Sequence, residues 1–253
     1  MHFSINLESV FRNIPMKEAL RTIAALGYDT CERWTIPQAQ EAALADGLQA
    51  NGLHLSAFCP DSFVLNDPAQ RDAYAAAIQS ACERAKRVGA TELITQTGMD
   101  TGRPLAEQYA SITEGLRQVV PILEAAGVTL LIEPLNTVKD HIGYGLSSSE
   151  DGFRIVEAVD SRHVRLLFDI YHQLHMEEDV LAQIHRGLPL IGHFHVAGFP
   201  ARDERLFEGF DYRPVFDVLQ ASGTQALVGL EFFPSDQAAA QEMLQALRAY
   251  QNT

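Results

Sequence analysis

The sequence has few cysteines, a single tryptophan and no long apolar run. Its 253 residues include three cysteines, Cys31, Cys59 and Cys82. Three scattered cysteines exclude a disulfide framework, and no Cys-x-x-Cys pair indicates structural zinc. No apolar stretch approaches the ~18 residues that a membrane span needs. The first residues also lack the basic start and long apolar core of a signal peptide. These absences predict a cytoplasmic protein without a membrane partner.

Positive charge is scarce as well. The chain has 19 Lys and Arg against 33 Asp and Glu, which gives a formal net charge of −14. A surface this acidic repels phosphate backbones, so we expect no nucleic-acid partner. Hydrophobic residues make up 47% and charged residues 21%, which is ordinary for a soluble globular protein, and a small neutral or metal-chelated substrate remains open.

Short β-rich runs alternate with longer helical stretches along the whole chain. The predicted strands are His2–Asn6, Thr30–Trp34, His54–Phe58, Glu92–Gln96, Thr129–Glu133, Val164–Asp169, Leu190–Val196 and Ala226–Glu231. Between them lie predicted helices such as Met16–Leu26, Gln70–Val88, Leu105–Ala125, Asp151–Val159 and Gln237–Tyr250. This alternation indicates a parallel sheet, because parallel strands need crossover helices.

The start of the chain helps to decide between an open and a closed parallel sheet. An open doubly wound sheet normally has a glycine-rich phosphate loop after its first strand. Here that strand is followed by Asn6-Leu7-Glu8-Ser9 instead. A chain of about 250 residues also matches the usual length of a (β/α)8 barrel. The sequence therefore predicts one α/β domain over residues 1–253, a (β/α)8 TIM barrel.

Four consecutive predicted strands end in side chains that can bind a metal: Glu133, Asp169, His195 and Glu231. The carboxyl ends of barrel strands converge on one mouth, where active sites are built. Three carboxylates at one mouth repel one another unless a cation neutralises them. Three carboxylates and one imidazole suit Mg2+, Mn2+ or Co2+ better than zinc. One divalent ion is therefore expected.

Each of these residues also has an ordinary structural alternative. A lone carboxylate at a strand end is commonly a helix cap, and Glu231 could cap a helix that starts near Ser235. His193 and His195 share one face of their strand, with Phe194 on the other. Either imidazole could be a hydrogen-bonded core residue, although His195 lies nearer the mouth. Four candidates on consecutive strands favour a site.

Several segments resemble the xylose-isomerase-like barrels. They are LLIEPLN (130–136), LLFDIYHQLHMEED (166–179), IGHFHVAGFPAR (191–202) and GLEFF (229–233). Within that superfamily they are most similar to the hydroxypyruvate isomerases and their sugar-acid relatives. The resemblance implies that Glu133, Asp169, His195 and Glu231 hold the metal. It also implies that His172 contacts a substrate oxygen and that Arg202 approaches the substrate.

The implied activity is a metal-dependent isomerisation of a small sugar or hydroxy acid. Glu133 and Glu231 act as base and acid on either side of an enediolate, and the expected reaction converts hydroxypyruvate to tartronate semialdehyde or acts on a related sugar acid. Hydroxypyruvate isomerases usually carry Gln where His195 stands, whereas ketose 3-epimerases carry His, so a ketose 3-epimerase is the alternative. A sugar dehydratase and a non-catalytic metal- or sugar-binding barrel are further alternatives. The apurinic-site endonucleases on this barrel need extra histidines after the second and third strands, which this sequence lacks.

Other candidate substrate contacts follow from their positions. Glu32 and Trp34 end the second predicted strand and are expected to line the pocket, although Trp34 could equally pack at the rim. Arg202 could pair with a substrate carboxylate or be an exposed loop arginine. His172 could instead only orient Asp169. The long loops at Pro60–Pro68 and Phe199–Pro214 leave a homo-oligomer open.

Overall fold

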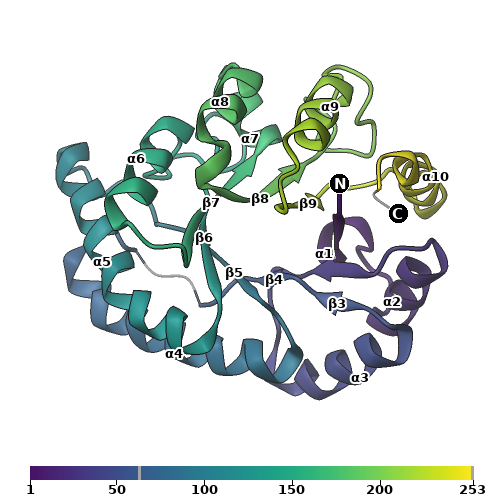
Figure 1. The fold of residues 1–253 in the computed structure, drawn as a ribbon, viewed down its shortest axis with the longest axis horizontal. Coiled ribbons are helices and arrows are strands. Elements are labelled where there is room, and N and C mark those ends of the chain that lie inside the picture. Colours follow the sequence, from purple (N-terminus) through teal and green to yellow (C-terminus); the bar gives the residue numbers. More distant parts are fainter. Residues whose placement is uncertain (62–63, 252–253) are drawn as a thin grey trace.

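The computed structural model describes residues 1–61 and 64–251. Residues 62–63 of the loop Pro60–Pro68, and residues 252–253 of the predicted domain, lie outside the described residues. Figure 1 shows helices arranged around a central set of strands, following one another around the molecule in chain order. The chain therefore has the predicted TIM-barrel architecture.

All the strand pairs of the described sheet are parallel. The strands are β1 Phe3–Asn6, β2 Thr30–Glu32, β3 His54–Leu55, β4 Ala57–Phe58, β5 Glu92–Thr95, β6 Thr129–Ile132, β7 Val164–Asp169, β8 Ile191–Val196 and β9 Leu227–Leu230. Their order is β3-β2-β1-β9-β8-β7-β6-β5-β4. Every predicted strand is present, with bounds that differ by at most two residues apart from the third.

The predicted third strand, His54–Phe58, is interrupted at Ser56. β3 pairs with β2, whereas β4 pairs with β5. Ser56 N donates to Cys31 O at 2.8 Å, and Glu92 N donates to Ser56 O at 2.9 Å. β3 and β4, the first and last strands in this order, thus belong to one continuous segment, and this segment closes the barrel. The single-strand prediction was wrong because barrel strands are staggered, so each half of this segment reaches only one neighbour.

Helices cover the outer face of the sheet. The longer ones are α2 Met16–Ala25, α3 Glu41–Asn51, α4 Arg71–Val88, α5 Leu105–Ala126, α6 Ser149–Val159, α8 Val180–Gly187, α9 Arg213–Ser222 and α10 Gln237–Leu247. Two short helices, α1 Leu7–Val10 and α7 Ile170–His175, begin directly after β1 and β7. Of the helices described, none has the length and apolarity that crossing a membrane requires.

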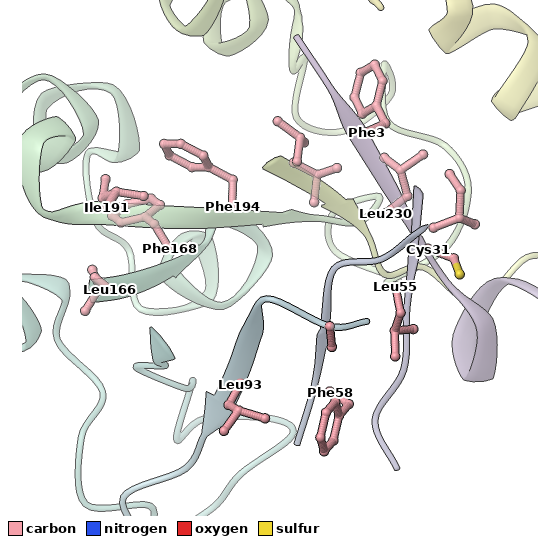
Figure 2. Packing of buried hydrophobic residues seen from close by; sticks show 14 of the residues in the cluster. Phe3, Cys31, Leu55, Phe58, Leu93, Leu166, Phe168, Ile191, Phe194 and Leu230 are labelled. Atoms are coloured by element: carbon pink, nitrogen blue, oxygen red, sulfur yellow. The ribbon is translucent and has the colours of Figure 1, made fainter. Parts of the chain in front are cut away.

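Buried side chains form an outer and an inner core. Figure 2 shows part of the outer core, in which Phe3, Phe168, Phe194 and Leu230 are packed with other apolar side chains of the strands. A smaller inner cluster comes from β4 to β7 and consists of Ala57, Ile94, Leu131 and Leu167. The residues that alternate with the outer core on β1, β2 and β8 are polar instead: Ser4, Glu32, His193 and His195. The barrel interior is therefore apolar on one side and ionisable on the other.

Candidate active site

The four candidate metal ligands lie together at one end of the barrel. Glu133 and Glu231 directly follow β6 and β9, Asp169 ends β7, and His195 is on β8. All four side chains are buried. His195 Nδ1 lies 3.6 Å from Glu133 Oε1, 4.0 Å from Asp169 Oδ2 and 3.6 Å from Glu231 Oε2. The fold thus brings the side chains from four neighbouring strand ends to one point.

This cluster fits a cation. Neither nitrogen of the buried His195 ring has a hydrogen-bond partner among the described residues, and Nδ1 is the one that faces Glu133, Asp169 and Glu231. Ligand atoms of Asp169, His195 and Glu231 lie within 4.8 Å of one another, as do those of Glu133, Asp169 and His172. Burial raises the pKa of Asp169 even though His195 and Arg202 lie nearby. A divalent ion would use the free nitrogen and offset the repulsion between the carboxylates.

Asp169 contributes to local structure as well as to the cluster. It is the N-cap of α7, and its Oδ1 accepts the backbone N–H of His172 at 3.1 Å. Its other oxygen, Oδ2, lies 3.5 Å from His172 Nε2. Because an aspartate is a favoured N-cap, the strand can turn into the helix without an intervening loop. One carboxyl group therefore fixes the start of α7 and faces the site.

His172 is held in one tautomer by Asn136. The backbone N–H and the side-chain amide of Asn136 lie 3.3 Å and 2.6 Å from His172 Nδ1. Both groups can only donate, so Nδ1 accepts and the ring proton lies on Nε2. Burial lowers the pKa of His172 to about 3. The imidazole is therefore neutral and presents an Nε2–H donor, for which the described residues supply no hydrogen-bond partner.

Both oxygens of Glu231 have partners. Trp34 Nε1 donates to Oε1 at 2.5 Å, and Arg202 donates to Oε2. The Arg202 guanidinium also lies over the ring of Tyr171, 5.1 Å from its centroid. Burial opposes the charge on Arg202, but Glu231 and Asp169 outweigh it and raise the pKa of Arg202. Because this side chain is only 14% exposed, an exposed loop arginine is excluded. The alternative in which Glu231 caps the following helix is excluded too, since Asp236 caps α10.

Glu32 does not line the pocket, contrary to our expectation. Its side chain is fully buried inside the barrel, where Oε2 lies 3.1 Å from His193 Nε2 and Oε1 lies 3.0 Å from His195 Nε2. On its other side, His193 Nδ1 lies 2.9 Å from Glu92 Oε2. Burial lowers the pKa of His193, but Glu92 and Glu32 outweigh it and raise the value to about 9. Glu32 lies next to Nε2 of His195, whereas Glu133, Asp169 and Glu231 lie next to Nδ1.

Comparison with known proteins identifies the family of this chain. A family model described as xylose isomerase-like TIM barrel matches residues 20–250. The chain belongs to this xylose isomerase-like family.

Two curated proteins and one crystal structure are similar to this chain. The 2-oxo-tetronate isomerase of Cupriavidus necator is 30% identical over 244 residues, which cover 92% of each chain. The hydroxypyruvate isomerase of Escherichia coli is 26% identical over 168 residues, 66% of this chain and 65% of that protein. A crystal structure titled AP endonuclease, family 2, from Brucella melitensis has a TM-score of 0.91 at 22% identity and covers 99% of each chain. At that identity, the last comparison shows the shared fold alone.

The pocket of this xylose isomerase-like barrel has a volume of about 370 Å³. Among the predicted site residues, its lining includes Trp34, Glu133, His172, His195, Arg202 and Glu231. It also includes polar residues that the sequence analysis did not single out: Thr35, Asp61, Thr95, Gln96 and His141. The His141 ring lies 5.2 Å from that of His172. Of these residues, Thr95 and Gln96 carried a usable signal, because one ends β5 and the other directly follows it.

Proposed function

We propose that this protein is a metal-dependent isomerase of a small hydroxy-oxo acid, of the hydroxypyruvate isomerase type. The observation that carries the proposal is the arrangement of Glu133 and Glu231. Their carboxylates each lie 3.6 Å from His195 Nδ1, and both line the same pocket. Two carboxylates that face one bound substrate can exchange a proton with neighbouring carbon atoms.

Glu133, Asp169, His195 and Glu231 would hold the divalent ion, with Mg2+, Mn2+ and Co2+ as the candidates that suit this donor set. When bound, such an ion polarises a substrate carbonyl and so acidifies the adjacent C–H bond. The unpartnered His195 Nδ1 supports this assignment.

The chain's own residues perform the proton transfer. With hydroxypyruvate, one glutamate removes a proton from C3, and the other delivers a proton to C2. The hydroxyl proton moves from O3 to O2, so the product is tartronate semialdehyde and no atom is gained or lost. The Nε2–H of His172 donates a hydrogen bond to the oxygen on which negative charge develops. Its neutral, fixed tautomer suits that role.

Arg202 would bind the substrate carboxylate. One terminal nitrogen is used by Glu231, whereas Nε has no hydrogen-bond partner among the described residues. The guanidinium lines the pocket, and its planar set of donors matches a carboxylate. This supports an oxo acid as the substrate in preference to a neutral ketose.

A ketose 3-epimerase is the second candidate, and His195 is the residue that favours it, because the epimerases resemble this chain at that position. In this case the proton would return to the carbon it left, on the opposite face. The catalytic groups are otherwise the same.

The test is proton exchange in D2O. The metal-loaded protein is incubated with hydroxypyruvate, tartronate semialdehyde and several ketoses, and NMR follows deuterium at each carbon. We expect interconversion of the two acids with deuterium incorporation, and none above the spontaneous rate with Glu133→Gln. Exchange at C3 of a ketose alone would favour the epimerase. Absence of metal-dependent exchange on all of these substrates would contradict the proposed proton transfer.

A further inference from the structure

A chain of four ionisable side chains crosses the barrel interior below the candidate metal cluster. Glu92 is on β5, His193 and His195 are on β8, and Glu32 is on β2. The successive distances are 2.9 Å from Glu92 to His193, 3.1 Å from His193 to Glu32, and 3.0 Å from Glu32 to His195. These three strands are not neighbours in the sheet. Their side chains therefore meet across the interior of the barrel.

A contribution to stability alone does not explain why these four ionisable side chains are buried in the barrel. TIM-barrel interiors are usually filled by branched apolar residues, as the opposite half of this interior is by Ile94, Leu131 and Leu167. Removing charges from water offsets most of the attraction between them, so buried ion pairs add little stability over an apolar packing. Glu32 and His193 are nevertheless fully buried. Their placement against His195 points to a role at the site above.

The backbone of β9 provides the space for this contact. A Cβ atom at Gly229 would overlap with His195 Cδ2, and it would lie 2.9 Å from both carboxylate oxygens of Glu32. Any larger residue at 229 would force the imidazole and the carboxylate to move. The glycine in the GLEFF segment thus permits the pair to form.

We propose that Glu32 is a positioning residue that directs His195 Nδ1 toward the metal. His195 Nε2 lies 3.0 Å from Glu32 Oε1, an ion-pair contact without hydrogen-bond geometry, and the imidazole presents its other nitrogen to Glu133, Asp169 and Glu231. A carboxylate against the far nitrogen of a metal-binding imidazole fixes the ring and strengthens it as a donor. His193, held between Glu32 and Glu92, keeps the Glu32 carboxylate from turning away. The inference rests on the proposed function only in taking a divalent ion as the ligand.

The test compares metal binding by the full-length wild-type chain and by Glu32→Gln. Glutamine keeps the volume but has one acceptor oxygen for two imidazole nitrogens. We expect the Kd for Co2+, measured by calorimetry, to rise about 10- to 100-fold. The Kd for Mg2+ should rise less, because imidazole contributes more to Co2+ than to Mg2+. A change in the Co2+ to Mg2+ ratio would not result from general loosening of the fold.

Ser4→Ala is the matched control. Ser4 is equally buried, and its hydroxyl lies 2.7 Å from that of Ser56. We expect this variant to bind both ions as the wild type does. An unchanged Co2+ affinity in Glu32→Gln, or an equal loss for both ions, would overturn the positioning role.

Two further outcomes are separable. If Glu32→Gln does not fold, Glu92→Gln replaces it, because the Glu92 side chain is 15% exposed and glutamine still accepts from His193. A smaller loss that again favours Mg2+ supports the inference, and unchanged affinities overturn it. If the wild type binds neither ion, the metal assignment of the proposed function fails and the role of Glu32 fails with it. If the wild type binds ions and the variants are unchanged, only the role of Glu32 is lost.

Discussion

Trp34 donates its indole N–H to Glu231 across 197 positions of sequence, at 2.5 Å. This residue is the single tryptophan of the chain, so all tryptophan emission arises beside one of the two proposed catalytic carboxylates. A loop residue of the N-terminal half is thereby attached to the end of the last strand.

Tryptophan fluorescence should report metal binding directly. Because an ion at Glu231 changes the field beside the indole, we expect Co2+ to alter the emission of Trp34 with the same half-saturation that calorimetry gives. Trp34→Phe should abolish the signal. It should also lower kcat/KM about 10- to 100-fold, the effect of losing a hydrogen bond to a charged group worth roughly 1.5–3 kcal/mol. An emission spectrum unchanged at saturating metal would contradict the placement of the ion.

His172→Phe should reduce kcat by about 100- to 1,000-fold with little change in KM, because it removes a donor aimed at developing charge. His175→Phe is the control, since His175 lies on the same helix and packs against Tyr171 and Phe199. Steady-state kinetics of both variants check the assignment. Equal effects of the two substitutions would indicate that α7 has been disturbed and that His172 has no special role.

Removal of the metal by a chelator should abolish activity while the barrel stays folded. At an ion concentration 100 times Kd, binding stabilises the native state by about 2.7 kcal/mol. For a chain of this size that corresponds to a fall in Tm of roughly 5–10 °C on chelation. Asp169→Asn, which retains a good N-cap for α7, should show a much smaller shift. Calorimetric scans with and without chelator measure this difference in Tm. An identical Tm in the two scans would argue against a bound ion.

Gly229→Ala should weaken Co2+ binding because the added methyl group overlaps with His195 and approaches Glu32. We expect the Kd to rise about 10- to 100-fold, as for other changes around a metal ligand. Gly47→Ala is the matched control, since its Cβ would meet only the end of the flexible Leu20 side chain. Wild-type affinity in Gly229→Ala would show that the His195–Glu32 contact can relax without consequence.

The barrel and the strand-end cluster could be predicted because both follow from short-range pattern. Parallel strands that are covered on both faces appear in the sequence as short apolar runs. Their alternation with helices is compatible with only a few folds. Glu133, Asp169, His195 and Glu231 follow the same logic, because the carboxyl ends of barrel strands share one mouth. These four residues could be predicted without knowing the paths of the loops.

The misplacement of Glu32 has a different origin. Sequence pattern assigns a residue to a strand end but not to a depth along the barrel axis, which depends on the stagger between strands. Glu32 and His195 are both near strand ends. The Glu32 carboxylate nevertheless lies inside the barrel, against Nε2 of the His195 ring. The partners of Trp34 and the position of His141 depend on loop paths, for which the sequence carried no periodic signal.

The interruption at Ser56 has a mechanical consequence. Hydrogen bonds of this one segment join β2 to β5. Their loss would convert the closed barrel into an open curved sheet in which the pairing from β5 through β9 to β2 is intact. All four candidate ligands belong to that uninterrupted arc. A substitution that weakens the wall at Ser56 is therefore expected to act first on Glu32 and Glu92, which lie on the two strands that this segment joins, and only through them on the cluster.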